Sequence, residues 1–233
     1  MCSEYPETDV TDHRHTAHML DLVLPLECGG CGARSTRWCG ACAGELTVKP
    51  DEPHLISPRL EPGVPVFSLG RYAGARREAI LAFKERGRAD LVDPLAAALR
   101  VGLARLLDWG VLEEPLTVVP APTRRWAARR RGGDPVARLA LAATDGHRDI
   151  TVVQAVRTRA LVADSVGLSS ADRQRNIAGR VKIVRPLEGR HGAACEVLVV
   201  DDIVTTGATA CETVRVLRAA GATVIAVLAL ANA

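Results

Sequence analysis

The chain is poor in aromatic side chains, which make up only 3% of its 233 residues. Because general single-strand binding proteins stack bases on aromatic rings, this scarcity argues against such a platform. A large excess of charge is also absent: the formal net charge is +3, from which no general affinity for polyanions follows. No apolar run approaches the roughly 20 residues of a membrane-spanning helix, and the first residues lack the basic start and apolar core of a secretory signal. We therefore expect a cytoplasmic, globular protein with no membrane insertion.

Cysteine is present seven times, and four of these residues form a C-x2-C-x7-C-x2-C pattern. In a cytoplasmic protein, two closely spaced pairs are typical of metal ligands rather than disulfides. Four thiolates bind Zn²⁺ in a closed, structural site, and the alternative is four reduced cysteines without a metal. The expected ligands are Cys28, Cys31, Cys39 and Cys42, whereas Cys2, Cys195 and Cys211 are expected to be bystanders or small core residues.

The chain divides into four segments by composition. We expect a flexible tail over 1–18, although its histidines His13, His15 and His18 leave a metal role open. A zinc-ribbon-like module follows over 19–46, and five prolines over 47–65 indicate a linker or an irregular crossing segment. Strands and helices then alternate over 66–233, which predicts an α/β fold with a parallel sheet. The expected strands are 66–69, 116–119, 150–153, 197–200 and 223–230, and the expected helices are 76–84, 91–107, 135–144 and one that begins at 210.

Residues 197–209 combine a short apolar strand, two adjacent carboxylates, a loop of small residues and the start of a helix. Ligands of open parallel sheets bind outside the carboxyl ends of the strands, and N–H groups at a helix start suit a phosphate. Paired carboxylates suit ribose hydroxyls or Mg²⁺. The pattern predicts a sugar phosphate site, and the alternative is an ordinary strand–turn–helix with an aspartate as helix cap. The candidate residues are Asp201 and Asp202, followed by Thr205, Thr206, Gly207, Ala208 and Thr209.

Five arginines fall within eight positions after the expected strand 116–119. Guanidinium groups are suited to phosphate oxygens, so this arginine-rich turn is a candidate pyrophosphate-binding loop. A solvated basic face or a nucleic-acid contact patch is the alternative. The arginines are Arg124, Arg125, Arg129, Arg130 and Arg131, followed by Gly132 and Gly133.

Residues 197–209 resemble the motif by which type I phosphoribosyltransferases bind phosphoribosyl pyrophosphate (PRPP). The wider layout resembles the ComF family over about residues 20–232: a cysteine module, a segment from Tyr72 to Lys84, the arginine-rich turn and the PRPP motif. The resemblance implies a parallel-sheet type I phosphoribosyltransferase fold, in which Asp201 and Asp202 orient the ribose rather than act as acid or base. It also implies that the loop from Thr205 to Thr209 holds the 5-phosphate. The arginine-rich turn, with Arg124, Arg125 and Arg131, would then hold the pyrophosphate together with Mg²⁺.

The resemblance also implies a hood loop over PRPP with Arg173 and Asn176, although these residues also fit an ordinary helix start. Three positions depart from the family patterns. Asp164 stands near where ComF proteins carry glutamine, and Asp134 stands where asparagine is usual. Thr205 replaces the aspartate of purine salvage enzymes, which argues against a 6-oxopurine acceptor. Lys84 could reach phosphate, but a lone lysine in a charged segment is more often solvated.

The sequence leaves three possible functions open. The first is Mg²⁺-dependent transfer of ribose 5-phosphate from PRPP to an unidentified nitrogenous acceptor. The second is a PRPP sensor without turnover. The third follows from the family name, which is linked to competence and DNA uptake, and implies contacts with single-stranded DNA or protein partners.

Overall fold

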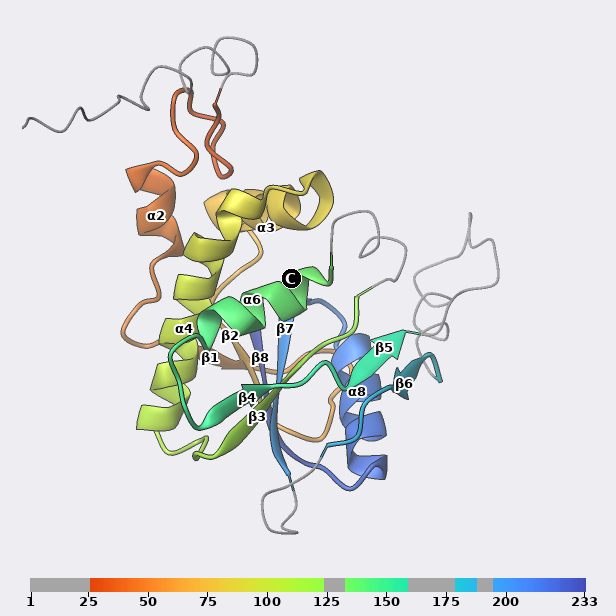
Figure 1. The fold of residues 1–233 in the computed structure, drawn as a ribbon. Coiled ribbons are helices and arrows are strands. Elements are labelled where there is room, and N and C mark those ends of the chain that lie inside the picture. Colours follow the sequence, from red (N-terminus) through yellow and green to blue (C-terminus); the bar gives the residue numbers. More distant parts are fainter. Residues whose placement is uncertain (1–25, 124–132, 159–178, 188–194) are drawn as a thin grey trace, which may run out of the picture.

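A six-stranded sheet forms the centre of the computed structural model, which describes residues 26–123, 133–158, 179–187 and 195–233 (Figure 1). The strand order is β1-β2-β8-β7-β3-β4, and every neighbouring pair is parallel except β1 with β2. The predicted α/β class with a mostly parallel sheet is therefore confirmed. The strands are β1 (His54–Ile56), β2 (Val66–Ser68), β3 (Leu116–Pro120), β4 (Ile150–Val152), β7 (Glu196–Val204) and β8 (Thr223–Asn232).

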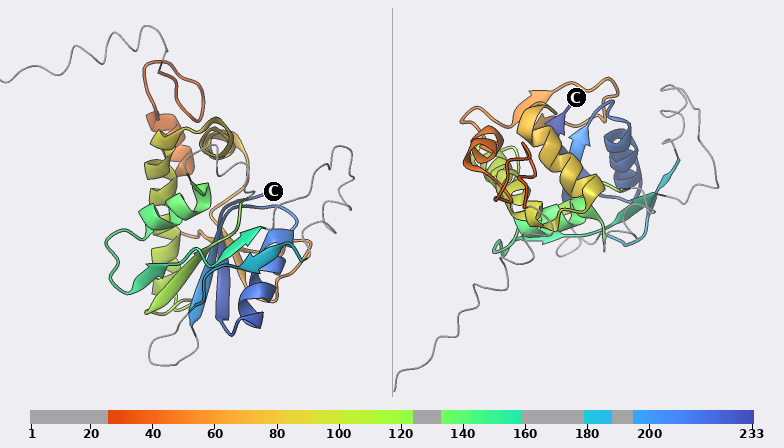
Figure 2. Two further views of the ribbon diagram at one scale, coloured as in Figure 1. Left: turned by 45° about the vertical axis from the view of Figure 1, so that its right-hand side comes forward. Right: turned by 90° about the horizontal axis from the view of Figure 1, so that it is seen from above.

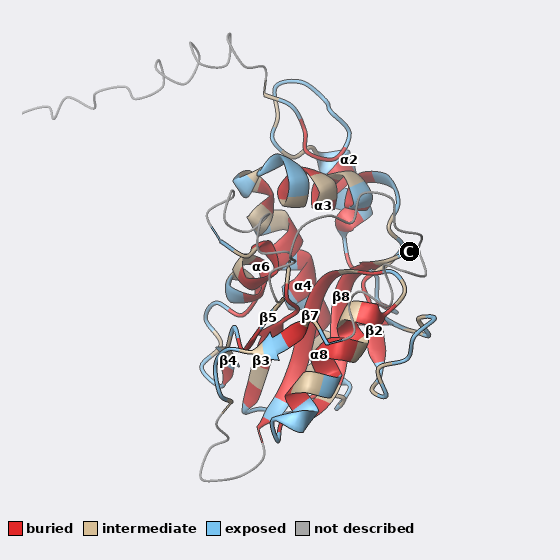
Figure 3. Ribbon diagram, turned by 90° about the vertical axis from the view of Figure 1, so that its right-hand side faces the viewer, coloured by how far each residue is buried: buried red, intermediate tan, exposed pale blue. Residues whose placement is uncertain are grey.

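Each face of the sheet packs against its own layer. Along β7, Leu198 and Val200 face one core, whereas Val197 and Val199 face the other. A strand buried on both faces reads as a continuous apolar run, which explains the sequence of β7, and Figure 3 shows the central strands as buried. The first layer holds α3 (Gly74–Arg86), the short 3₁₀-helix η1 (Ala89–Leu91), α4 (Val92–Asp108) and α6 (Pro135–Ala143). The second holds α8 (Ala208–Ala219) and the antiparallel pair β5 (Val156–Thr158) and β6 (Val181–Ile183) (Figure 2).

The strand β7 is longer than the sequence predicts. It continues through Asp201 and Asp202 to Val204, and Asp201 lies opposite Ala229 of β8. The apolar pattern ends at Val200, so periodicity alone could not extend the strand across two carboxylates. The acidic pair is therefore part of the sheet rather than of the loop that follows it.

The cysteine segment contains a helix, α2 (Gly40–Leu46), that the sequence did not predict. Its Glu45 Oε2 accepts a hydrogen bond from the N–H of Ala75 at 2.9 Å, at the start of α3. The residue before α3, Ala73, gives no side-chain cap, so Glu45 satisfies a helix N–H group that would otherwise lack a partner. Leu46 and Val48 continue into the main core. The cysteine segment is thus packed against the start of α3.

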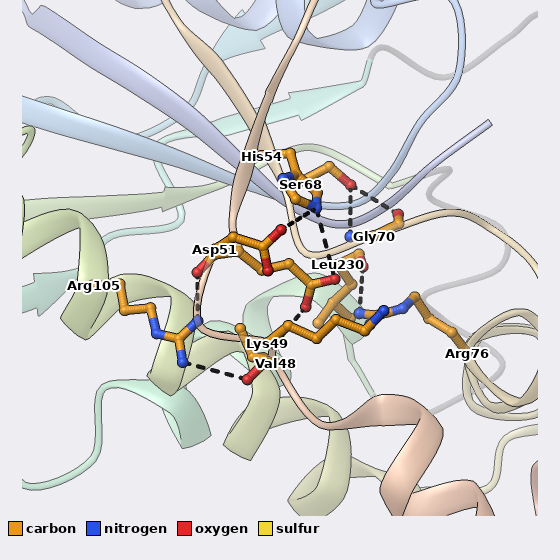
Figure 4. Close-up of polar contacts among 10 residues, drawn as sticks. Val48, Lys49, Asp51, His54, Ser68, Gly70, Arg76, Arg105 and Leu230 are labelled. Atoms are coloured by element: carbon orange, nitrogen blue, oxygen red, sulfur yellow. Dashed lines mark hydrogen bonds and ion pairs between the residues drawn. The ribbon is translucent and has the colours of Figure 1, made fainter.

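Residues 47–65 contain β1, which pairs with β2, and polar contacts hold the residues that precede β1. Arg105 of α4 donates to the carbonyls of Glu52 at 2.7 Å and Val48 at 3.4 Å, and the N–H of Lys49 donates to the Glu52 carboxylate at 2.8 Å. Figure 4 shows Arg105 beside Val48 on one side of these contacts, and Arg76 on the other side, where it donates to the carbonyl of Leu230. These bonds fix the path from the cysteine segment to the sheet.

Within the described part of the chain, no helix is both long enough and apolar enough to cross a membrane.

Candidate functional site

The predicted acidic pair and the loop over 205–209 lie at the carboxyl end of β7, where the chain connections from β7 and β3 turn to opposite faces of the sheet. From β7 the chain passes through α8 to β8, and from β3 it passes through α6 to β4 on the opposite side. The two helices cover opposite faces of the sheet. A crevice between such strands, at their carboxyl ends, is the usual ligand position in open α/β sheets. The N–H of Ala121 donates to the carbonyl of Val200 at 2.7 Å, so the segment leading to the arginine-rich turn begins beside the acidic pair.

The acidic pair is buried at this end of β7. Asp201 is 8% exposed and Asp202 is 4% exposed, and the N–H of Asp202 donates to Asp201 Oδ1 at 2.8 Å. Burial raises the pKa of Asp201 well above its ordinary value, and the neighbouring charge of Asp202 raises it further, although Lys84 opposes both effects. Buried carboxylates with such a shift are typical of functional sites.

A hollow of about 60 Å³ joins Asp201 to the loop that follows β7. It is lined by Asp201 and residues 203–210, and therefore by all five loop residues predicted to hold a phosphate. Gly207 occupies the N-cap position of α8 and provides no side-chain cap, so no side chain at that position blocks the first turn of the helix. Backbone N–H groups at a helix start favour an anion.

One wall of this loop comes from a segment that the sequence analysis did not assign to the site. The N–H of Leu60 donates to the carbonyl of Thr206 at 2.8 Å. A Cβ atom at position 207 would lie 2.2 Å from the carbonyl oxygen of Leu60 and 3.0 Å from Pro58. The proline-rich segment thus closes over the phosphate loop, and Gly207 is required both by its φ of +82° and by this contact.

Lys84 is a second residue at this site that the sequence analysis did not assign to it. Its Nζ lies 2.7 Å from Asp202 Oδ2 and 3.0 Å from Oδ1, whereas a solvated side chain was the favoured expectation. Burial alone would lower the pKa of Lys84, but the charge of Asp202 raises it above its ordinary value. The only sequence signal was the family-like segment from Tyr72 to Lys84, because a contact across 118 positions has no local pattern.

The arginine-rich turn and the hood loop lie outside the described residues, so Arg124, Arg125, Arg131, Arg173, Asn176 and Asp164 are not placed. The flanks of the turn are placed. Thr123 Oγ1 donates to Asp134 Oδ2 at 2.7 Å, and Asp134 Oδ1 accepts from the N–H groups of Val136 and Ala137 at the start of α6. One carboxylate therefore joins the two ends of the turn and caps a helix.

We expect Asp134→Ala to lower the free energy of unfolding by about 1–2 kcal/mol, the usual cost of losing a helix N-cap. Asp134→Asn keeps an oxygen for the cap and is the matched control, expected to lose less than half as much. Urea unfolding followed by circular dichroism measures both variants. Equal stability of the alanine variant and the native protein would contradict the capping role.

The four predicted metal ligands come together beside the start of α3, where Cys28 and Cys42 pack with Ala75. The sulfur atoms of Cys28, Cys31, Cys39 and Cys42 all lie within 4.8 Å of one another, so the cluster could hold a metal such as zinc. Cys28 and Cys42 are buried, whereas Cys31 is exposed. Burial works to raise the pKa of Cys28, but hydrogen bonds from backbone N–H groups, including those of Cys31 and Cys39, lower it to about 6. A thiolate at neutral pH is what metal binding needs.

Of the other cysteines, the two that the structure describes lie apart from this cluster. Cys195 is buried in the second core, where its Sγ lies 3.1 Å from Thr117 Oγ1, as expected of a small core residue. Cys211 is half-buried on α8, and Cys2 lies outside the described residues, as do the three histidines of the tail.

No protein-family model matches the sequence, and no curated protein matches it. Solved structures with some likeness are phosphoribosyltransferases. A hypoxanthine phosphoribosyltransferase from Staphylococcus aureus is 16% identical, with TM-scores of 0.33 and 0.34 in two crystal forms; the match covers 60% of this chain. The chain spans 62% of the length of that enzyme. A phosphoribosyltransferase from Corynebacterium diphtheriae is 22% identical over 82% of this chain and 83% of its own, with a TM-score of 0.34.

Proposed function

We propose that this chain binds PRPP and transfers its ribose 5-phosphate group to a nitrogenous acceptor in a Mg²⁺-dependent reaction, as a type I phosphoribosyltransferase-like protein. One observation carries the proposal: Asp201, the first member of the buried acidic pair, and the phosphate-type loop line a single hollow at the carboxyl end of β7. The carboxylate end suits a ribose diol, and the helix start suits the 5-phosphate. The cysteine module and the arginine-rich turn make the ComF family the proposed affiliation.

In the proposed reaction the bond between the anomeric carbon and pyrophosphate breaks, and a bond from that carbon to the acceptor nitrogen forms. The acceptor loses a proton, and pyrophosphate leaves with the bonding electrons. Asp201 and Asp202 position the ribose, which contributes through orientation. Their carboxylates are also oxygen donors that suit Mg²⁺, which when bound neutralises charge on the departing pyrophosphate.

The cysteine cluster has a separate role in this proposal. Four cysteine ligands leave no open position on a tetrahedral Zn²⁺, so the metal would be structural and take no part in transfer. The cluster supports α3 through Glu45. Contacts with single-stranded DNA or protein partners would use the cysteine module and the arginine-rich turn, and residues 124–132 of that turn lie outside the described part.

Calorimetry of the zinc-loaded chain with PRPP and Mg²⁺ tests the proposal. We expect the native protein to bind PRPP, and the double variant Asp201→Asn, Asp202→Asn to bind it about a hundredfold more weakly, since each charge-assisted hydrogen bond contributes roughly tenfold. Release of pyrophosphate in the presence of candidate nitrogenous bases then separates a transferase from a sensor.

Asp90→Asn is the matched control, because Asp90 is an ion-paired aspartate that contacts Arg88 rather than the acidic pair. It should bind PRPP as the native protein does. Native protein that ignores PRPP, or a double variant with undiminished affinity, would refute the assignment of the ligand to this hollow.

A further inference from the structure

Lys84 forms an ion pair between α3 and the end of β7 that the stability of the fold does not explain. It lies in the last turn of α3, where a cation is favoured by the helix dipole, and it pairs with a carboxylate at the end of β7. The Asp202 side chain is 5% exposed and the Lys84 side chain is 31% exposed. The carboxylate is thus fixed in the protein, whereas the lysine side chain keeps access to solvent.

Apolar packing already holds α3 in place. A buried ion pair seldom stabilises a protein more than apolar groups of the same size would, so the pair is not explained by the stability of the helix. The helix residues that belong to the main core are Ala79, Ile80, Ala82 and Phe83.

Asp202 also keeps unused capacity to accept hydrogen bonds. Its Oδ2 is buried and receives no hydrogen bond of good geometry, although the ammonium of Lys84 lies 2.7 Å away. Buried polar atoms in native proteins normally have such a partner. Because the ammonium meets this oxygen as an ion pair and not through an aligned hydrogen bond, the oxygen can still accept from a donor that a ligand supplies.

The layer that contains Lys84 also contains α6. Arg138 of α6 lies over the ring of Phe83, the residue before Lys84, at 5.8 Å. The C-terminal half of α3 and the start of α6 are therefore neighbours, and α6 follows the arginine-rich turn in the chain. The phosphate loop, in contrast, leads into α8 on the opposite face.

We propose that Lys84 is a ligand-binding residue, paired with Asp202 in the empty site and with the pyrophosphate group of PRPP in the filled site; this inference rests on the proposed function. Ribose hydroxyls and a divalent cation bring positive charge and donors to Asp202, and two cations on one carboxylate repel each other. The flexible lysine then turns to the nearest anion. Lys84 would therefore make the site prefer PRPP over ribose 5-phosphate, which has no pyrophosphate.

The test compares these two ligands by calorimetry in the presence of Mg²⁺. Lys84→Met should weaken PRPP binding roughly tenfold or more, the effect of one hydrogen bond to a charged group, and should change the affinity for ribose 5-phosphate by less than about twofold. Lys84→Arg should restore most of the preference for PRPP, because it keeps the positive charge.

Arg86→Met is the matched control, since Arg86 is an exposed cation two residues further along α3 that contacts Glu78. It removes the same charge away from the acidic pair and should leave both affinities unchanged. Circular dichroism and urea unfolding establish that each variant is folded, and Lys84→Gln replaces Lys84→Met if the latter is not.

Three other outcomes would overturn the inference, and each has a different meaning. Equal losses for PRPP and ribose 5-phosphate would mean that Lys84 only maintains the structure of the site. Unchanged PRPP affinity would mean that the ammonium never meets pyrophosphate. Native protein that binds neither ligand would overturn the proposed function, and this inference with it.

Discussion

Gly207→Ala is expected to abolish detectable PRPP binding and to lower the free energy of unfolding by about 2–4 kcal/mol. The residue has a φ of +82°, which costs an L-amino acid about 1–2 kcal/mol. In addition, the new methyl group would lie 2.2 Å from the carbonyl oxygen of Leu60. That carbonyl cannot move freely, because the N–H of Leu60 is bonded to Thr206 in the same loop. The loop must therefore shift, and its N–H groups lose their alignment toward the 5-phosphate.

Gly221→Ala distinguishes the cost of a positive φ from the cost of the contact with Leu60. Gly221 has a nearly identical φ of +86°, but no atom lies within 4 Å of the position where its Cβ would be. This variant should lose only about 1–2 kcal/mol and should bind PRPP like the native protein. Urea unfolding and calorimetry on both variants give the comparison. If the two alanine variants behaved alike, the wall formed by residues 58–60 would have no part in the site.

Loss of zinc from the cysteine cluster is expected to cause a large loss of local stability. Apparent binding free energies of structural zinc are on the order of 10 kcal/mol, so Cys31→Ser should lose bound zinc and destabilise residues 26–46. Cys31 is exposed, so the substitution removes a ligand with little loss of packing. The disturbance should reach the start of α3, because Glu45 of α2 binds the N–H of Ala75, and because Ala75 packs against Cys28 and Cys42.

Zinc analysis and hydrogen exchange measure this effect. Amides of α2 and of the first turn of α3 should lose protection in Cys31→Ser and in chelator-treated native protein, whereas amides of β3 and β7 should keep it. Cys211→Ser is the control, since Cys211 lies on α8 away from the cluster. A native protein without zinc, or a Cys31→Ser variant with unchanged exchange, would show that the cysteines are reduced thiols with no metal role.

The sequence predicted most of the regular elements because their signals are local. The helices expected over 91–107 and 135–144 are α4 (Val92–Asp108) and α6 (Pro135–Ala143), and the last strand expected over 223–230 is β8 (Thr223–Asn232). The strands β5 and β6 were not predicted, because three residues are too few to give a periodic pattern. Helix α2 was also missed, since it has only seven residues, two of which are glycines that disfavour a helix.

By itself, the sequence determined the chemical types at the site: two carboxylates, a loop of small residues and four cysteines at metal-ligand spacing. These are contiguous or nearly contiguous in the chain, so short-range pattern is enough to find them. Only the tertiary structure decided that Lys84 meets Asp202 and that Leu60 closes over Thr206. Both contacts join residues more than a hundred positions apart. Their partners are selected by strand order and helix packing, which leave no trace in the local sequence.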